Sequence, residues 1–187
     1  MKIMTHQLKP ADLLFVKTPP NVEETFATAI SESTGAYSHV AIATSATTII
    51  HATPDYGVIE QPLGVFLTDH PLVDVLRLAD LNAPEILLEA RKHLGKPYNH
   101  SFYPDAAGFY CSQLVVSAFA NQVKLPESAM AFGDGVEAIS GYWQVYFDQL
   151  GLAVPLGQLG SNPAALAKFS ALEYIGPLTN ANSDFQP

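Results

Sequence analysis

Cys111 is the only cysteine of the chain, and it stands where an aromatic-rich loop meets an apolar stretch with helical spacing. The positive end of a helix dipole and a neighbouring imidazolium both lower the pKa of a thiol, and the resulting thiolate attacks acyl carbonyls. A lone cysteine is also among the commonest small residues of protein cores. Cys111 therefore indicates acyl chemistry only if a histidine can reach it.

Two histidines are placed to do so. His39 in "YSHVAIAT" and His51 in "TTIIHAT" lie in otherwise apolar, strand-like segments separated by a short turn. If these segments pair as a hairpin, both imidazoles can share one sheet face, and a neutral His51 can fix the tautomer of His39. One such histidine is usually a satisfied core residue, but two beside a helix-start cysteine predict a site. The remaining histidines lie near termini, turns or a helix end and are expected to be solvated: residues 6, 70, 93 and 100.

The elements that must position these side chains follow from hydrophobic spacing and from turn and capping residues. Strands are expected at 11–18, 37–44, 47–53, 57–63 and 72–79. Helices are expected at 21–35, 82–95, 111–123 and 141–151, with a further helix and a short strand-like end within 161–176. The fold class is therefore α+β: a meander of about five antiparallel strands with helices before and after it. Residues 1–178 are expected to form a single domain, and 179–187 a flexible tail.

Composition narrows the class of protein. Apolar residues make up 48%, as in globular chains, and charged residues only 14%, so the composition is not that of a disordered chain. A net charge of -9 argues against nucleic acid or anionic membranes as partners. No 18-residue apolar run and no signal-peptide-like start are present, so we expect no stable membrane insertion and a cytoplasmic protein. A single cysteine cannot form an internal disulfide, and no HExxH or CxxC spacing supports a metal site or another cofactor.

Several segments, taken in chain order, resemble one family: "KPADLLFV", "SHVAI", "IIHA", "GVIEQPL", "GKPYN", "YCSQLVVSAF" and "NPAALAKFSALEYIG". They are similar to the YiiX-type permuted papain-like amidases, which are relatives of the NlpC cell-wall peptidases and, more distantly, of the lecithin:retinol acyltransferase group. The resemblance runs from about Pro10 to Gly176. In papain the cysteine precedes the histidine, whereas here the histidine strand comes first. The resemblance thus implies a circularly permuted papain-like fold with a cysteine at a helix N-terminus.

The resemblance also implies roles for three residues. Cys111 matches the family nucleophile, His39 matches the base, and His51 falls at the third polar position. YiiX-type proteins often carry glutamate at that third position, whereas the acyltransferase branch carries histidine. Being uncharged, His51 should stabilise an imidazolium less than glutamate would. We therefore predict a thiol pKa less depressed than in glutamate-bearing relatives.

Four further positions are notable beside the resemblance. Gln113 stands where glutamate is commoner in the family, and Ala11 replaces a usual glycine before Asp12. Tyr98 and Tyr110 flank the expected site in sequence and are candidates for binding substrate. Loop aromatics more often only pack, so both readings stay open.

The function implied is a cysteine-dependent hydrolase that cleaves an amide bond through a thioester on Cys111. A cell-wall-derived peptide or an N-acyl amine would suit as the small acyl or peptide substrate. One alternative is an acyltransferase or lipid hydrolase of the same chemistry, suggested by His51. Another is a non-catalytic binding module that retains the fold. The sequence leaves these alternatives, and the oligomeric state, open.

Overall fold

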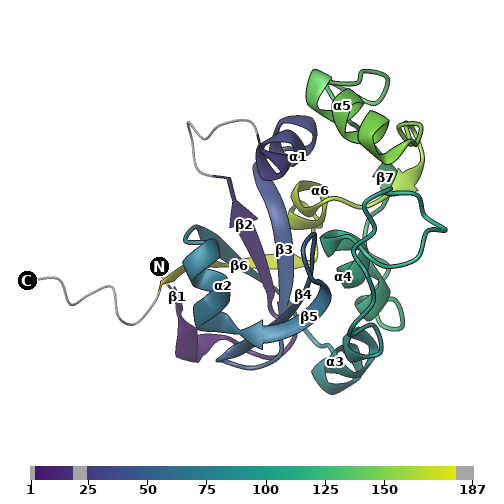
Figure 1. Ribbon diagram of the computed structural model, residues 1–187. Coiled ribbons are helices and arrows are strands. Elements are labelled where there is room, and N and C mark those ends of the chain that lie inside the picture. The colour runs from purple at the N-terminus through teal and green to yellow at the C-terminus, as the bar shows by residue number, and fades with distance from the viewer. Residues whose placement is uncertain (1–2, 19–24, 180–187) are drawn as a thin grey trace, which may run out of the picture.

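The computed structural model describes residues 3–18 and 25–179, and its centre is a seven-stranded sheet in the order β1-β9-β6-β2-β3-β4-β5 (Figure 1). The five expected strands are all present and pair antiparallel, which confirms the α+β class. They are β2 (Leu13–Lys17), β3 (Tyr37–Ala43), β4 (Thr48–Thr53), β5 (Gly57–Pro62) and β6 (Val73–Leu78). The expected meander is wrong in one connection, because β6 pairs with β2 and not with β5.

Two strands from the ends of the chain extend the sheet beyond the expected five. β9 (Leu172–Thr179) pairs antiparallel with β6, and β1 (Ile3–Met4) pairs parallel with β9, so the sheet is mixed. β9 was expected only as a short strand-like end within 161–176. A separate two-stranded ladder joins β7 (Ser128–Ala129) to β8 (Leu159–Gly160). The expected tail lies, except for Thr179, outside the described residues.

Most helices begin where the sequence places a capping residue. Asn82 accepts from Glu85 N–H at the start of α3 (Ala83–Arg91), and Asn162 accepts from Ala165 N–H at the start of α6 (Pro163–Ala167). Ser140 caps α5 (Gly141–Leu150) in the same way. The other helices are α1 (Phe26–Thr34), α2 (Leu63–Asp69), α4 (Cys111–Phe119) and the single 3-10 turn η1 (Thr5–Gln7).

Four helices differ from expectation. α2 was not predicted, because its seven residues directly follow Pro62 and are too few to show a helical period. α4 ends at Phe119, four residues before the expected end, and α3 ends at Arg91 and is followed by turns up to Gly95. The expected helix at 21–35 begins only at Phe26, because Thr25 is extended and its side chain caps the helix; residues 21–24 lie outside the described part.

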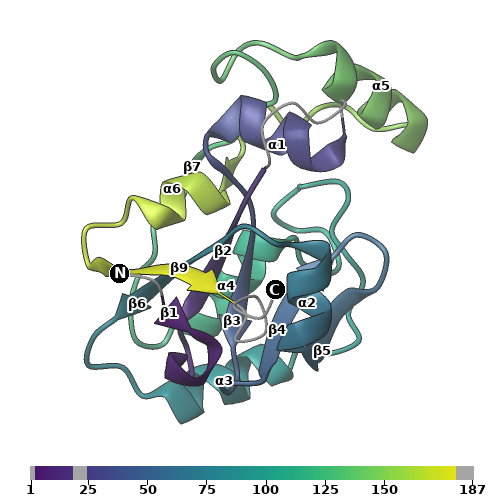
Figure 2. The ribbon, with the colours of Figure 1, turned by 90° about the vertical axis from the view of Figure 1, so that its left-hand side faces the viewer.

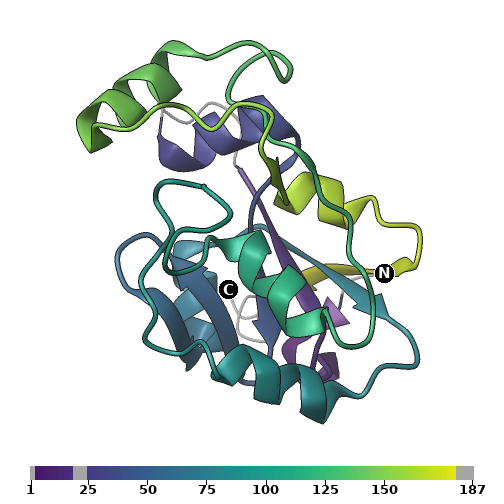
Figure 3. The same cartoon turned by 90° about the vertical axis from the view of Figure 1, so that its right-hand side faces the viewer.

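Alternation along the strands divides the core into two clusters on the two sides of the sheet. On β3, Val40 and Ile42 belong to the larger cluster, together with apolar residues of α3, α4 and α5. Ala41 and Ala43 belong to the smaller cluster, together with Leu63 and other residues of α2. Figure 1 shows α2 on one side of the sheet and α3 and α4 on the other, and Figure 3 shows α4 and α3 from their own side. None of the described helices is both long and apolar enough to span a membrane.

Helices α1 and α5 meet at the end of the sheet away from α3 (Figure 2). The rings of Phe26 in α1 and Trp143 in α5 pack edge to face, 5.7 Å between centroids. Trp143 also donates its ring N–H to the hydroxyl of Ser33 at 3.0 Å. These contacts lie beside the start of α4, where Cys111 and the candidate site lie.

Candidate active site

Cys111 is the first residue of α4, as the sequence predicts, and only 4% of it is exposed. The start of the helix is fixed by Gln113, whose side-chain oxygen accepts from Tyr110 N–H at 3.3 Å and from the Asn99 side-chain amide at 3.2 Å. Gln113 therefore ties the aromatic-rich loop to the helix. A neutral amide suffices for both bonds, which accounts for glutamine at this position.

The loop before Cys111 folds back on itself so tightly that one position requires glycine. Gly108 has φ +88°, and a Cβ there would lie 2.0 Å from the carbonyl oxygen of Pro97. That same oxygen accepts from Phe109 N–H at 3.1 Å, and Asn99 N–H donates to the carbonyl of Phe109 at 3.2 Å. The close approach of the two halves of the loop sets the direction in which the chain enters α4.

The surroundings of the thiol favour its protonated form. Burial raises the pKa of Cys111 to about 11, against which backbone hydrogen bonds from Val40, Ser112 and Cys111 itself act in the lowering direction. The thiol is therefore neutral at physiological pH. A thiol pKa that is not depressed is the direction expected with an uncharged third residue, and the comparison with glutamate-bearing relatives stays a prediction.

The two strand histidines are brought together, as the hairpin interpretation requires. His39 Nε2 lies 2.9 Å from His51 Nδ1, and both rings contact Phe66 of α2, at 6.1 and 5.4 Å between centroids. The pairing of Ile42 with Ile50 places His51 diagonally across from His39 on the same face. The predicted pair of imidazoles is thus a feature of the β3–β4 register.

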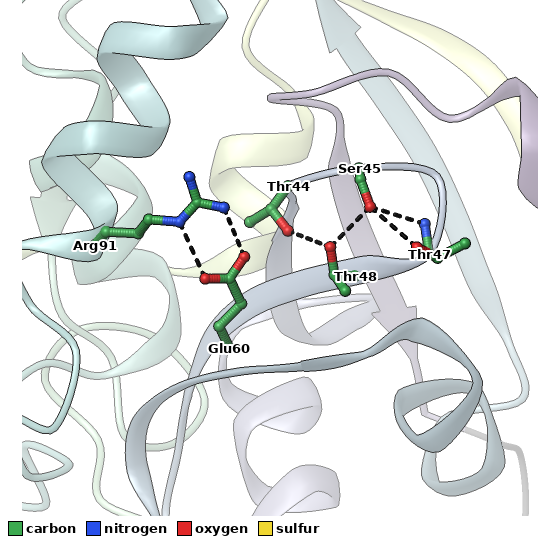
Figure 4. A network of polar contacts seen from close by, with 6 residues as sticks. All are labelled: Thr44, Ser45, Thr47, Thr48, Glu60 and Arg91. Carbon is green, nitrogen blue, oxygen red and sulfur yellow. Dashed lines mark hydrogen bonds and ion pairs between the residues drawn. The ribbon is translucent and has the colours of Figure 1, made fainter.

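Polar contacts at the other end of these strands hold that register (Figure 4). The hydroxyls of Thr44 and Thr48 are 2.6 Å apart across the β3–β4 turn, and Ser45 is 2.8 Å from Thr48. On the next strand, Glu60 accepts two hydrogen bonds from Arg91 of α3, at 2.7 and 3.0 Å. The hydrogen bond and charge of Arg91 lower the pKa of Glu60. A one-residue slip of β4 would move His51 to the opposite face.

Gln61 extends the histidine pair into a chain of three side chains, and sequence reasoning missed it. Its side-chain nitrogen lies 3.1 Å from His51 Nε2. If this amide donates, His51 must donate from Nδ1 to His39, and His39 keeps its proton on Nδ1. Turning the isosteric amide by 180° reverses both bonds and leaves Nδ1 of His39 as an unprotonated base. The signal in the sequence was alternation, since Ile59 and Gln61 point to the face of Ile49 and His51.

His70 also belongs to this group, so the expectation that it is solvated is wrong. Its ring stacks on that of His39, 5.4 Å between centroids and tilted by 22°. Burial is the main cause that lowers the pKa of all three histidines, that of His51 to about 4. All three imidazoles are therefore neutral at neutral pH, the state in which a histidine can act as a base.

Two other histidines that were expected to be solvated are engaged as well. The Nε2 of His93 lies 3.0 Å from the Ser117 hydroxyl, and the Nδ1 of His100 lies 2.9 Å from the Tyr146 hydroxyl. Both contacts join the loop region after α3 to neighbouring helices.

The thiol of Cys111 and the imidazole of His39 line two different pockets. Cys111, Tyr98 and Tyr110 line a cavity of about 50 Å³, whereas His39 and His70 line a cleft of about 390 Å³ that also reaches Tyr98. Within the described part of the chain, no hydrogen bond joins the thiol to His39 or His51. The thiol does touch β3, through the backbone of Val40, the residue after His39. The catalytic pairing of Cys111 with His39, and substrate binding by Tyr98 and Tyr110, stay predictions.

A metal centre was not expected from the sequence. Within residues 3–18 and 25–179, no group of three or more histidine, cysteine, aspartate or glutamate side chains is arranged to hold a metal ion. Asp69, beside His70, and Asp55 line the cleft of His39 without forming such a group.

Histidine strands that precede a cysteine helix, all on one mixed sheet, define a protein of the permuted papain-like class. The sequence model of the permuted papain-like amidase family YaeF/YiiX, C92, matches residues 7–174, and the chain belongs to this family. The crystal structure of the metalloprotein YiiX from Escherichia coli O157:H7 has the same fold, with a TM-score of 0.74 over 91% of this chain and 97% of that one. The two sequences are 19% identical. No curated protein sequence matches the chain significantly.

Proposed function

We propose that this protein is a cysteine amidase in which Cys111 is the nucleophile, His39 the base and His51 the residue that orients His39. The observation that carries the proposal is the place of Cys111. Its thiol stands at the first residue of α4, beside a cavity, and lies near the backbone of Val40, the residue directly after His39. Membership of an amidase family supports the same chemistry.

The reaction follows from these groups. His39 takes the thiol proton as the Cys111 sulfur attacks the acyl carbon, and the carbonyl oxygen becomes an oxyanion near the backbone N–H of Cys111. The carbon–nitrogen bond then breaks as His39 gives its proton to the leaving amine. Water attacks the resulting thioester, which releases the acid and restores the thiol. In the resting structure His39 lies on the face of β3 that carries Ala41 and packs with Phe66, whereas Cys111 belongs to the cluster on the other face. The transfer of the thiol proton therefore requires the His39 ring to turn toward the thiol when substrate binds.

His51 favours a second candidate with the same first half-reaction. In an acyltransferase, an acceptor other than water takes the acyl group from the Cys111 thioester. Histidine at the third position is the pattern of the acyltransferase branch, and the hydrogen bond between His51 and His39 fits that role. The two candidates differ in which nucleophile discharges the thioester.

The protein can be tested with p-nitrophenyl acetate as a general acyl donor and intact mass as the readout. We expect an acetyl adduct on Cys111, no adduct in Cys111→Ser, and acylation slowed at least about 100-fold in His39→Ala. His6→Ala, which removes an exposed histidine in η1, is the matched control and should acylate normally. Acylation at the wild-type rate in His39→Ala would refute the role of the base. Absence of any adduct on wild-type Cys111 would favour the non-catalytic binding module.

A further inference from the structure

We infer that the cavity beside Cys111 binds the acyl half of the substrate and accepts only a small, uncharged, apolar group, of about methyl to isopropyl size. The inference rests on the proposed function and specifies its substrate class. The cavity is bounded by parts of α1, α4, α5 and the β7–β8 region. Cys111 and Ser112 contribute the wall from which the acyl carbon would be attacked.

The lining of the cavity has no charged side chain. Aromatic and aliphatic groups form most of it: Ile30, Tyr98, Phe102, Met130, Phe132 and Trp143. A carboxylate or ammonium group placed there would lose its hydration without gaining a counter-charge. The cavity therefore selects against charged acyl groups.

Most of the hydroxyls in the lining are already engaged within the protein, and that of Tyr110 accepts from Ser161 N–H at 3.2 Å. Ser33 accepts from the Trp143 ring, and Thr34 donates to the carbonyl of Ile30 at 2.8 Å. Ser112 and Ser161 share a hydrogen bond of 3.1 Å. An additional polar group in the cavity would have to compete with these bonds. Shape and apolar contact are therefore the means of recognition.

The size of the cavity limits the group to a few carbon atoms. Its volume is about 50 Å³. For comparison, one water needs roughly 10–15 Å³, and a cavity that binds benzene has roughly 150 Å³. Gly160 closes one wall, because a Cβ there would lie 2.1 Å from Met130 Cε and 2.8 Å from the Tyr110 hydroxyl. A long lipid acyl chain therefore does not fit inside the cavity and would have to extend out of its mouth.

Met130 lines the cavity, and shortening its side chain should change the selectivity for the length of the acyl group. Its flexible side chain is 9% exposed and projects from the β7–β8 region, where its backbone N–H donates to Gln158 at 2.9 Å. Met130→Ala deepens the cavity by three side-chain atoms, whereas Ala131→Leu fills it from the neighbouring position. Leu125→Ala removes a buried side chain of the same core cluster outside the cavity and is the matched control.

The experiment measures acylation of Cys111 by the acetate, butyrate, hexanoate and octanoate esters of p-nitrophenol. In each reaction the sulfur–acyl bond forms, p-nitrophenolate leaves, and the thiol proton passes through His39 to solvent. For the wild type we expect hexanoate to react at least about tenfold more slowly than butyrate. Met130→Ala should raise the hexanoate-to-butyrate ratio about tenfold, Ala131→Leu should favour acetate, and Leu125→Ala should keep the wild-type order.

The outcomes separate this inference from the function on which it rests. If Cys111 is acylated but wild type and Met130→Ala share one chain-length profile, the cavity does not hold the acyl group and the inference is wrong. If no ester acylates Cys111, the proposed function fails and the inference fails with it. Circular dichroism identifies a variant that does not fold, and Met130→Ala and Ala131→Leu each suffice for the test.

Discussion

Replacing His51 with glutamate should make the thiol of Cys111 more reactive at neutral pH. In the wild type both partners are neutral at rest, since burial raises the pKa of Cys111 to about 11 and lowers that of His39. Moving the thiol proton to His39 is therefore strongly uphill. A carboxylate at position 51 would stabilise the imidazolium form of His39 and reduce that cost.

The size of the effect follows from the distance between the two rings. Their centroids are 5.1 Å apart. At that separation, with an effective dielectric constant of about 20, opposite unit charges attract by about 3 kcal/mol. This corresponds to about two pKa units on His39 and to about a 100-fold larger population of thiolate–imidazolium pairs.

The assay is the rate of iodoacetamide alkylation of Cys111 between pH 6 and pH 10. We expect His51→Glu to alkylate up to about 100-fold faster than wild type at pH 7, with a lower apparent thiol pKa. His51→Gln keeps a neutral hydrogen-bonding group and should show no such gain. Thermal melts of each variant show whether it has folded.

A double variant tests whether the effect of the carboxylate on Cys111 alkylation changes sign when His39 is removed. Without His39, the carboxylate has no imidazolium to stabilise and acts on the thiolate only as a like charge, which raises the thiol pKa. Introducing His51→Glu into a His39→Ala background should therefore slow alkylation. The reasoning is refuted if His51→Glu alone raises the thiol pKa, or if it accelerates alkylation equally with and without His39.

Three further predictions concern stability, each measured by urea or thermal unfolding. Arg77→Met should lower the free energy of unfolding by about 3 kcal/mol, because it leaves the buried Asp12 without its bidentate partner at 2.6 and 2.8 Å. Arg91→Met breaks a more exposed ion pair and should lower it by less than about 1 kcal/mol. Equal losses in the two variants would contradict this distinction between a buried and an exposed pair. Ala11→Gly should stabilise by about 0.5–1 kcal/mol, because Ala11 has φ +69°, a left-handed conformation; a lower melting temperature would count against strain there. The pKa of His51 in the folded protein, about 4, lies below the unfolded value of 6.5. The contribution of neutral His51 to the free energy of unfolding is therefore complete above pH 6.5, and it decreases as pH falls toward 4, by about 2–3 kcal/mol at pH 4.5. His51→Gln should lose less stability over that pH range than the wild type, and an identical pH profile in both proteins would contradict this.

The sequence predicted those parts of the site that depend on local pattern. His39 and His51 follow a strand alternation that a single short turn brings into register, so their meeting could be inferred before the structure was known. Cys111 is the first residue of an apolar helical period, and α4 begins there. In each case the spacing within one or two neighbouring elements determines the geometry.

Features that depend on distant segments were missed. The pairing of β6 with β2 joins residues about sixty positions apart and has no signature in local spacing. Gln61 reaches His51 only because the register of a third strand brings it there. The raised thiol pKa comes from burial by segments as far apart as α1, the loop containing Phe102, and α5. A helix-start cysteine suggests a thiolate, but tertiary burial outweighs the helix dipole here.

The same apolar surroundings explain both the neutral thiol and the neutral histidines. Desolvation raises the pKa of an acid and lowers that of a base, so a buried cysteine and a buried histidine move away from ion-pair formation together. Burial at both partners therefore disfavours a preformed thiolate. Under the proposed function, the thiol proton moves to His39 only as the sulfur attacks. The negative charge that develops on the carbonyl oxygen is then stabilised by the backbone N–H of Cys111. Selectivity then lies in the acylation step, because only a substrate that fills the small cavity places its carbonyl carbon against the sulfur and its oxygen against that N–H.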